Sequence, residues 1–301
     1  MTLPQPLLET DFSVDYPNKP GALRNVQLLL YPGEVLGLIG ESGSGKSTIA
    51  LALLRLLGLK RGVITGQVLF EGKNLLNTSE REMEQLRGSK IGLVLQSPMA
   101  SLNPALRIGT QLEEAWRAHA RGSRHERTAA VERALTRVGL PHDQEFRRRL
   151  SSQISVGQAQ RVLIAMAIMH SPALLIADEP TSALDAVTQA EVLDMLARLN
   201  RETGSSLLYI SHDLQSVASI CGRLAILHEG TIVESGPTAT ILRQPRHPYT
   251  QRLLACAPWL SWWNQQLPDM KHSPNSISGT YCTTPVPTSP GLKSPCSPPM
   301  G

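Results

Sequence analysis

One short motif constrains the fold of this 301-residue chain more than any other feature of the sequence. The pattern GxxxxGK[ST] is matched at every fixed position by the run Gly40-Glu41-Ser42-Gly43-Ser44-Gly45-Lys46-Ser47. An apolar run at 34–40 predicts a buried strand before the motif, and apolar residues at helical spacing over 47–57 predict a helix after it. A glycine-rich turn that matches by chance is the alternative, and the flanking strand and helix argue against it.

The residue types of this loop suit the binding of phosphate groups. Its glycines allow backbone angles that a Cβ forbids, and its N–H groups and the helix N-terminus direct positive charge at an anion. Lys46 is expected to reach the β- and γ-phosphates of a nucleotide, and the Ser47 hydroxyl is expected to ligate Mg²⁺. The next residue, Thr48, is counted with the nucleotide-binding set.

A second chemical element follows another apolar run, at 174–177. Two carboxylates, Asp178 and Glu179, come directly after it. Asp178 is placed to hold Mg²⁺ through water, and Glu179 can polarise an attacking water molecule. Two acids at a strand end can also cap the next helix, but the phosphate loop elsewhere in the chain favours the chemical role.

The order of apolar runs predicts an α/β fold. Strand-like runs recur at 90–96, 173–178, 206–211 and 223–228, with helical patterns at 187–201 and 214–221. Strands that alternate with helices predict a parallel sheet covered on both faces. Between 104 and 170 only helical patterns occur, at 111–120, 125–138 and 158–169. We interpret residues 97–172, approximately, as an inserted helical subdomain.

Composition changes near residue 259, and residues 1–260 are predicted to form one nucleotide-binding domain. From 267 to 301 the chain is rich in Pro, Ser and Thr and poor in large apolar side chains. Such a segment cannot bury enough surface to offset its ordering entropy, so 261–301 is predicted to be a disordered tail. Its two cysteines, Cys282 and Cys296, lack the spacing of a metal site.

Composition excludes several other classes of protein. No run of about 18 apolar residues occurs, so the chain is not expected to span a membrane. The first residues lack a basic stretch followed by an apolar one, so no secretory signal is expected. Four cysteines at wide spacing predict ordinary thiols in a reducing cytoplasm. A net charge of +4 is a weak excess, and no nucleic-acid partner is expected.

Five further elements, together with the phosphate loop and the acid pair, resemble the nucleotide-binding subunits of ABC transporters. They are, in chain order, Tyr16, Gln96 in VLQSP, the run Ser155-Val156-Gly157-Gln158, the run Ser182-Ala183-Leu184-Asp185, and His212 in SHD. The resemblance covers residues 7–258 and implies an α/β P-loop NTPase fold with a mixed sheet core and an inserted helical subdomain. It implies ATP hydrolysis as the activity, with ATP and Mg²⁺ bound.

The resemblance also implies roles for these residues. Tyr16 stacks on adenine, and Gln96 binds Mg²⁺ and links the γ-phosphate to movement of the helical subdomain. His212 holds the geometry of the γ-phosphate and the water that Glu179 activates. The ATP held on the P-loop of a second subunit is contacted by signature and D-loop residues: Ser155, Gly157, Gln158 and Asp185.

A narrower resemblance comes from the run Gln244-Pro245-Arg246-His247-Pro248-Tyr249-Thr250, which Leu253-Leu254 follows. It is similar to the closing motif of dipeptide, oligopeptide and nickel importer ATPases. This branch implies import of a peptide, nickel or a metal chelate, driven by ATP. It also implies a second, non-identical ATPase subunit, two transmembrane permease subunits and an extracytoplasmic solute-binding protein. This chain would then attach peripherally to the cytoplasmic face of the cell inner membrane.

The signature departs from the family at Val156, where glycine is usual. A β-branched residue there must approach ATP closely and disfavours a positive φ, which predicts one impaired ATP site. The other site uses Lys46, Asp178, Glu179 and His212 of this chain and is expected to work. The subunit pair is therefore predicted to be asymmetric, and a tolerated valine without effect is the alternative.

Two other classes of function stay open from the sequence. A soluble ABC ATPase of DNA repair or translation usually needs a long coiled coil or two ATPase domains, and this chain shows neither. A subunit that binds ATP but turns it over weakly is supported only by Val156, while Glu179 and His212 argue against it.

Overall fold

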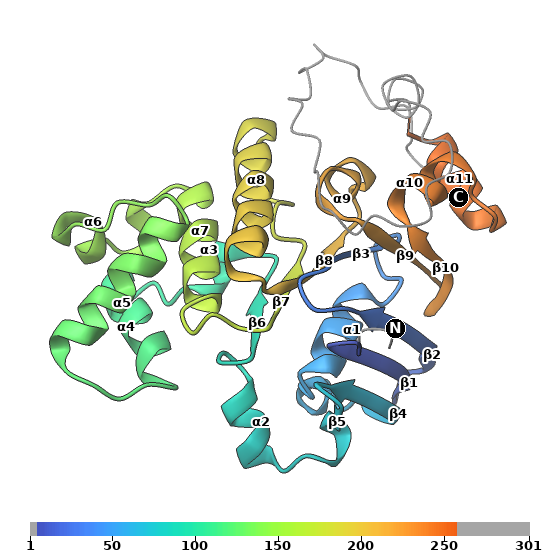
Figure 1. Ribbon diagram of the computed structural model, residues 1–301, viewed down its shortest axis with the longest axis horizontal. Coiled ribbons are helices and arrows are strands. Elements are labelled where there is room, and N and C mark those ends of the chain that lie inside the picture. The colour runs from blue at the N-terminus through green and yellow to red at the C-terminus, as the bar shows by residue number, and fades with distance from the viewer. Residues whose placement is uncertain (1–4, 258–301) are drawn as a thin grey trace. The chain divides into compact units, whose positions relative to one another are not determined.

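A computed structural model describes residues 5–257, and Figure 1 shows the arrangement of their elements. The predicted tail, with Cys282 and Cys296, lies outside the described residues. A six-stranded sheet forms the centre, in the order β10-β9-β3-β8-β7-β6. Its strands are β3 (Val35–Ile39), β6 (Ile91–Val94), β7 (Leu174–Asp178), β8 (Ser206–Ser211), β9 (Arg223–His228) and β10 (Thr231–Pro237).

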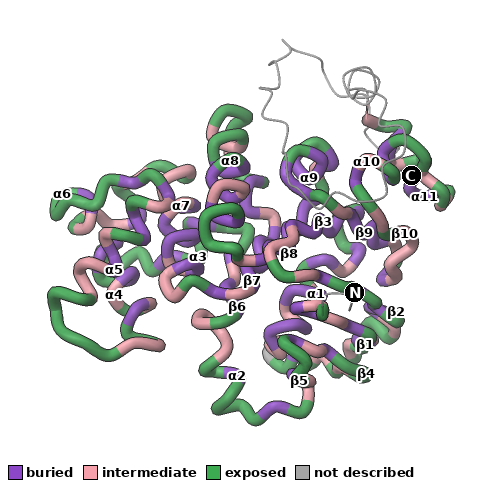
Figure 2. Tube along the Cα trace, in the orientation of Figure 1, coloured by how far each residue is buried: buried purple, intermediate pink, exposed green. Residues whose placement is uncertain are grey.

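The central sheet is parallel except at one edge, where β10 pairs antiparallel with β9. Every residue of β3, β7 and β8 is buried, as a parallel sheet with both faces covered requires (Figure 2). All five strands predicted from the apolar runs are present in this sheet. The predicted strand at 90–96 ends at Val94, which leaves Gln96 in the loop beyond its carboxyl end.

A second, antiparallel sheet was not predicted from the sequence. Its order is β2-β1-β4-β5, with β1 (Leu8–Tyr16), β2 (Lys19–Leu30), β4 (Val63–Phe70) and β5 (Lys73–Asn74). In β1 alternate residues such as Phe12 and Val14 are buried, while Asp11 before them and Asp15 after them are exposed. Polar residues on the open face interrupt the apolar pattern, so no continuous run marks the strand. The two sheets together confirm the mixed sheet core.

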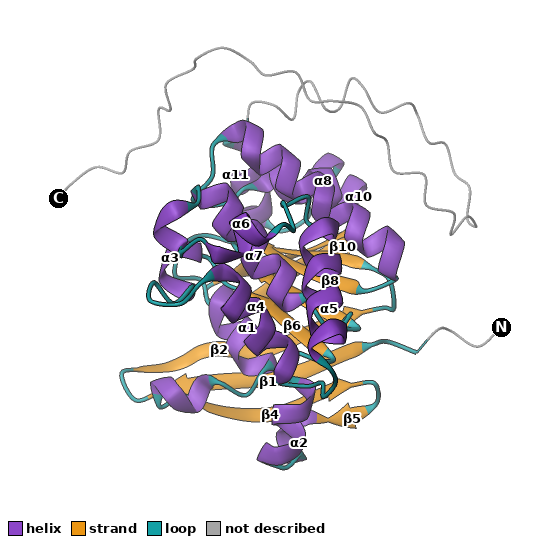
Figure 3. Ribbon diagram, turned by 90° about the vertical axis from the view of Figure 1, so that its left-hand side faces the viewer, coloured by secondary structure: helices purple, strands orange, loops and turns teal. Residues whose placement is uncertain are grey.

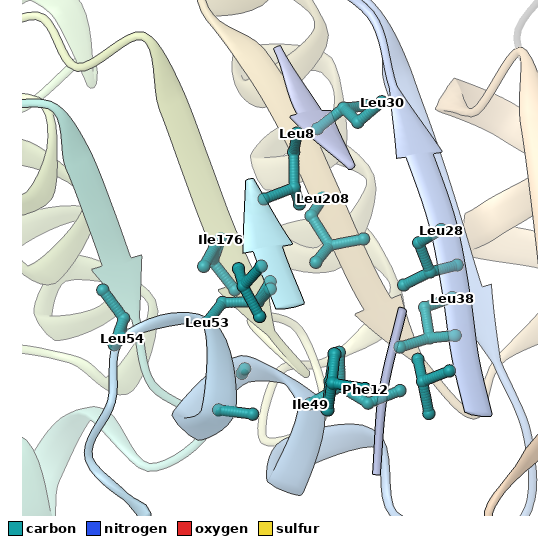
Figure 4. Close-up of a cluster of buried hydrophobic side chains, with 14 of the residues drawn as sticks. Leu8, Phe12, Leu28, Leu30, Leu38, Ile49, Leu53, Leu54, Ile176 and Leu208 are labelled. Carbon is teal, nitrogen blue, oxygen red and sulfur yellow. The ribbon is translucent and has the colours of Figure 1, made fainter. Parts of the chain in front are cut away.

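Helix α1 (Lys46–Leu53) belongs to the apolar core that both sheets share. In Figure 4, Ile49 and Leu53 of α1 lie in a cluster that includes Phe12 of the antiparallel sheet and Leu208 of the central one. Each fully buried side chain of this size contributes about 1.5–3 kcal/mol by leaving water. The helix that begins at the phosphate loop is therefore firmly fixed.

Between β6 and β7 the chain forms helices and no sheet strand, as predicted. These helices are α3 (Pro98–Ser101), α4 (Ile108–Arg117), α5 (Arg124–Arg137), α6 (Gln144–Arg148) and α7 (Val156–Ala167), with a 3-10 helix at Ser151–Gln153. Helix α4 contacts α5, α6 and α7, so they pack as a group. Figure 3, seen from the side of this group, shows its helices in front of the central sheet and the antiparallel sheet at the lower end.

The remaining helices connect or flank the strands. They are α2 (Glu80–Leu86), α8 (Ala186–Thr203), α9 (Leu214–Ile220), α10 (Thr238–Arg243) and α11 (Pro248–Ala255), with 3-10 helices at Leu57–Lys60 and Leu75–Asn77. The predicted helices at 187–201 and 214–221 are confirmed as α8 and α9. Over residues 5–257, no helix combines the length and the apolar character needed to cross a membrane.

Candidate active site

The phosphate loop joins β3 to α1 and is held tightly against two other strands. A Cβ on Gly40 would lie 2.2 Å from the carbonyl oxygen of Leu227 in β9. Gly45 has a φ of 112°, and a Cβ there would lie 2.6 Å from a methyl carbon of Leu23 in β2. Any other residue would clash at Gly40, and would both clash and be strained at Gly45. The glycines of the motif are therefore required by the packing of the loop.

Lys46 carries a buried positive charge into this loop. Its ammonium group donates hydrogen bonds to the carbonyl oxygens of Gly40 (2.9 Å) and Glu41 (3.0 Å). Burial lowers the pKa of Lys46, and the carboxylates of Glu179 and Asp178 act against that fall. A cation removed from water favours an anionic partner, so the loop is prepared to receive phosphate oxygens.

Glu179 follows β7 in an unusual backbone conformation. Its φ is +47°, in the left-handed region that residues with a side chain seldom adopt. Its N–H donates to the carbonyl oxygen of Ile210 (2.9 Å), and its carbonyl accepts from the Ser182 hydroxyl (3.1 Å). These bonds hold a conformation that costs of order 1–3 kcal/mol, a kind of strain that gathers at functional sites.

The carboxylate of Glu179 is the point where the site residues meet. Its Oε2 accepts a hydrogen bond from Gln96 Nε2 at 2.7 Å. Its Oε1 lies 3.7 Å from Lys46 Nζ and 3.2 Å from His212 Nδ1. The glutamate side chain is only 13% exposed, whereas that of His212 is 55% exposed. One carboxylate thus contacts a cation, an amide and an imidazole, and of these partners the imidazole is largely open to solvent.

Strand order explains why these four residues converge. Lys46, His212, Glu179 and Gln96 follow β3, β8, β7 and β6, which are consecutive neighbours in the central sheet. The carboxyl ends of parallel strands lie at one edge of the sheet, where ligands of such folds bind. The sequence named all four residues, and the structure places them together.

A nucleoside triphosphate with Mg²⁺ fits the donors of this site. The hydroxyl of Ser44 is buried and has no hydrogen-bond partner among the described residues, so a phosphate oxygen would satisfy it. Ser47 is exposed on the first turn of α1, Thr48 is half-buried beside it, and Asp178 is buried at the end of β7. Hydroxyl and carboxylate oxygens are ligands that Mg²⁺ takes together with substrate phosphates.

The rest of the loop faces solvent. Glu41, Ser42 and Gly43 are exposed, and Gly43 has a φ of +80° with no atom within 4 Å of an added Cβ. These three residues are therefore accessible to a ligand. Over residues 5–257, no group of three or more His, Cys, Asp or Glu side chains is placed to hold a metal ion. A bound Mg²⁺ would depend on the phosphates for its remaining ligands.

Tyr16, predicted to stack on adenine, lies at the end of β1. Its ring is half-buried and packs against Gly62, where a Cβ would lie 2.8 Å from ring carbon Cε1. The ring also packs on the apolar cluster that contains Leu57. The contact with adenine stays a prediction.

The signature residues lie at the start of α7. Ser155 is the N-cap residue: its hydroxyl accepts from the Gln158 N–H (3.2 Å), and the Gln158 side chain accepts from the Ser155 N–H (3.1 Å). Val156 is the first helical residue and has no positive φ. The predicted conflict between valine and a positive φ therefore does not arise in this structure, because Val156 lies in the regular first turn of the helix. Its side chain is 39% exposed, so the predicted crowding of a ligand is untested.

Asp185 caps helix α8 beside the signature. Its carboxylate accepts from the N–H groups of Val187 (3.1 Å) and Thr188 (3.0 Å) and from the Thr188 hydroxyl (2.7 Å). These hydrogen bonds, those from Thr188 first, lower the pKa of Asp185. A Cβ on Gly157 would lie 2.6 Å from the Thr188 methyl carbon, so the starts of α7 and α8 are in close contact. The site residues thus form two groups, one around Glu179 and one where these helices begin.

Two contacts of the phosphate loop could not be found from the sequence. The Leu227 carbonyl that meets Gly40 is a backbone atom, which no residue pattern marks. Leu23, which meets Gly45, lies in a strand that the pattern did not reveal. The only available signal was that both positions of the motif require glycine.

The fold and this arrangement define a P-loop ATPase. The family model described as ABC transporter matches residues 23–182, and the model described as oligopeptide/dipeptide transporter, C-terminal region, matches residues 233–281. The chain belongs to the ABC transporter family, and within it the chain is an ATP-binding subunit that hydrolyses ATP.

Individual relatives point to the same branch. The chain is 44% identical over 245 residues to a putative peptide import ATP-binding protein of Brucella ovis, a match that covers 79% of this chain and 72% of the relative. It is 41% identical over 246 residues to the oligopeptide transport ATP-binding protein OppD of Bacillus subtilis, covering 81% and 69%. Among solved structures, the ATP-binding cassette MJ0796, a dimer bound to ADP and Pi, is 27% identical with a TM-score of 0.66, covering 77% of this chain and 98% of that one.

Proposed function

We propose that this chain powers the import of peptides through a membrane transporter by binding and hydrolysing ATP. The observation that carries the proposal is the Glu179 carboxylate, which contacts Lys46, Gln96 and His212 at the carboxyl edge of the central sheet. Peptide is favoured over nickel or a metal chelate because the relatives described above are named for peptide transport. The alternative of a soluble ABC ATPase that acts in DNA repair or translation has no support among these relatives.

Each residue of the site has a task in this reaction. ATP supplies the γ-phosphoryl group that is transferred to water. Lys46 neutralises phosphate charge, and it exchanges Glu179 for phosphate oxygens as its anionic partner. Glu179 then orients and activates the water, and His212 fixes the geometry on the solvent side. Because Gln96 is bonded to Glu179, a change at the carboxylate is passed directly to the loop that leads into α3.

Mg²⁺ would be held by the hydroxyl of Ser47 and by Asp178 through water, with Gln96 as a further ligand. The chemistry it supplies is neutralisation of charge on the phosphates. Tyr16 supports the adenine ring in this proposal. The Mg²⁺ assignments are supported by the oxygen ligands at the start of α1 and the end of β7, and the adenine assignment is supported by the half-buried ring at the end of β1.

We also propose that the complete ATP site needs two subunits. The group at Ser155, Gly157, Gln158 and Asp185 lies where α7 and α8 begin, and its own hydrogen bonds are local capping bonds. A second, non-identical ATPase subunit would place its P-loop against this group and its own signature against the P-loop of this chain. MJ0796, which shares the fold, is described as a dimer.

The proposed assembly has further parts. Two transmembrane permease subunits would bind the helical segment of residues 97–172, approximately, within a nucleotide-binding domain of residues 1–260. An extracytoplasmic solute-binding protein would deliver the peptide. This chain would lie on the cytoplasmic face of the inner membrane, attached through the permeases.

Uptake of a labelled oligopeptide by cells that depend on this transporter tests the proposal. Lys46→Ala should abolish uptake, because the buried ammonium beside Glu179 is removed. The matched control is Lys90→Ala, which removes an exposed lysine that lies 3.5 Å from Glu71. Uptake that survives Lys46→Ala, or that is lost equally in the control, contradicts the proposal. Uptake of nickel instead of peptide would leave the proposed ATPase role in place and would show that the transported solute is nickel.

A further inference from the structure

A buried tyrosine of β8 has no role in the site described so far. Tyr209 is 0% exposed, and its hydroxyl is hydrogen-bonded to the hydroxyl of Thr181, which is 4% exposed, with Oη and Oγ1 3.2 Å apart. Burial raises the pKa of Tyr209 to about 12, so the phenol keeps its proton at neutral pH. A buried hydroxyl costs free energy unless it is hydrogen-bonded. The pair therefore ties β8 to the turn that follows β7.

The ring of Tyr209 lies on the other face of the central sheet from α1. Its neighbours in the strand, Leu208 and Ile210, belong to the apolar cluster that holds α1. Successive side chains of a strand point to opposite faces of the sheet, so the tyrosine ring points away from that cluster. Loss of its hydroxyl should therefore leave the start of α1, and with it the binding of phosphate, in place.

The turn after β7 begins at the strained residue Glu179, and Thr181 lies two residues further on. The Glu179 N–H donates to the carbonyl oxygen of Ile210, the residue that follows Tyr209. The N–H of Leu184 donates to the carbonyl oxygen of Thr181 (3.1 Å), which closes the turn before α8. A left-handed φ at a residue with a side chain persists only where the surroundings restrain it. Strand β8 supplies two such restraints, one through the backbone of Ile210 and one through the hydroxyl of Tyr209.

The same strand leads to His212, three positions after Tyr209. Asp213, the next residue, caps α9, and its carboxylate accepts from Gln189 Nε2 of α8 (2.9 Å). The turn that begins at Glu179 and the helix that follows it are thus bonded to β8 before the imidazole and to the loop after it. These two bonds fix the relative positions of the segments that carry the carboxylate and the imidazole.

We propose that Tyr209 is a positioning residue for ATP hydrolysis, which acts through Thr181 to hold the Glu179 carboxylate in place beside His212. This inference deepens the proposed function and rests on the role of Glu179 stated there. Without the hydroxyl pair, the turn loses the side-chain contact that helps to keep Glu179 in its strained conformation. The rate depends on how closely the base is held to its productive geometry, so hydrolysis should suffer while ATP binding does not.

The test is the kcat for ATP hydrolysis by the assembled complex, together with its ATP affinity, both measured well below the melting temperature. Tyr209→Phe keeps the ring and removes only the hydroxyl. It should lower kcat about fivefold, the size of one net hydrogen bond, while ATP affinity stays within about twofold of the wild type. The matched control is Tyr31→Phe, since Tyr31 precedes β3 at the end opposite the phosphate loop, and it should keep the wild-type kcat. A lower melting temperature with unchanged kcat in Tyr209→Phe would mean that the tyrosine only stabilises the core, and this result overturns the inference.

Two substitutions of Thr181 separate the hydrogen bond from packing. Thr181→Val keeps the shape of the side chain and removes the hydroxyl, so it should lower kcat as much as Tyr209→Phe does. Thr181→Ser keeps the hydroxyl and removes a methyl group, so kcat should stay within about twofold of the wild type. In the Thr181→Val background, Tyr209→Phe should change kcat less than twofold. An unchanged fivefold loss in that background, or a Thr181→Ser variant as slow as Thr181→Val, overturns the inference.

Glu179→Gln separates failure of this inference from failure of the proposed function. Hydrolysis that depends on Glu179 but not on Tyr209 overturns the inference alone and leaves the ATP site as proposed. Hydrolysis that does not depend on Glu179 overturns the role of that carboxylate and the inference with it.

Discussion

Replacement of Gly40 by alanine is the sharpest steric test of the phosphate loop. The added Cβ would lie 2.2 Å from the Leu227 carbonyl oxygen and 2.8 Å from the Ser44 hydroxyl oxygen. The first distance is more than about 1 Å shorter than an ordinary contact. Leu227 is in the central sheet and cannot rotate away, so the loop or the strand must move by roughly 1 Å.

The size of the effect follows from this displacement. Overpacking of this kind costs typically about 1–3 kcal/mol, which lowers the melting temperature of a domain this size by roughly 2–12 °C. A shift of about 1 Å in positioned groups costs about 100-fold in rate. Gly40→Ala should therefore lose most ATP binding and hydrolysis while it still folds.

Calorimetric ATP binding and thermal unfolding of the same preparation provide the assay. Gly222→Ala is the control, since no atom lies within 4 Å of its added Cβ and its φ is not positive. The control should match the wild type in both measurements. A Gly40→Ala variant with wild-type melting temperature and wild-type ATP affinity would refute the reasoning. The added Cβ would then fit beside the Leu227 carbonyl without the clash that the structure predicts.

Three further predictions concern the second group of site residues. Gly157→Ala should lower the melting temperature, because the added Cβ would clash with the Thr188 methyl group. Thr188→Ser removes only that methyl group and should restore most of the loss. A failure of Thr188→Ser to restore stability would contradict this contact. Asp185→Ala should destabilise the protein at neutral pH. The folded pKa of Asp185 is lowered, so its contribution to stability is present above the ordinary pKa of 3.8 and is lost as the pH falls through the folded pKa. The difference in melting temperature between wild type and Asp185→Ala should vanish in that range. A difference that stays constant with pH would contradict the capping role. Val156→Gly should raise ATP hydrolysis by the assembled complex, and an unchanged rate would show that the exposed valine is tolerated.

Much of the central sheet could be predicted because its strands are buried on both faces. The five residues of β3 and of β7 are all apolar or small until the final Asp178, so each reads as a continuous run. In the antiparallel sheet, strand β1 buries one face, and its open face carries residues such as Asp11 and Asp15. A short alternation of apolar and polar residues is difficult to distinguish from the mixed residues of the neighbouring turns.

The candidate site, like the fold, could be predicted from the sequence only in part. The phosphate-loop motif named Lys46, and the acid pair after an apolar run named Glu179. His212 was named only through the family resemblance, because a lone histidine at a strand end carries no such signal. The sequence could not show that one carboxylate contacts all of its partners, since this depends on the order β3-β8-β7-β6, which is not the order of the chain. From the sequence, Tyr249 was only part of a family motif. Its ring stacks on the imidazole of His228, and no local pattern relates these two segments of the chain.

The central claim is that Glu179 of this chain activates the water that hydrolyses ATP. The direct measurement is ATP binding and ATP hydrolysis by the assembled complex, wild type against Glu179→Gln. The amide keeps the size of the side chain and removes the base, so ATP should bind within about twofold of the wild type while hydrolysis falls at least about 100-fold. Hydrolysis that persists within about tenfold of the wild type would contradict the claim and would mean that the P-loop of the partner subunit, closed by the Val156 signature, performs the reaction.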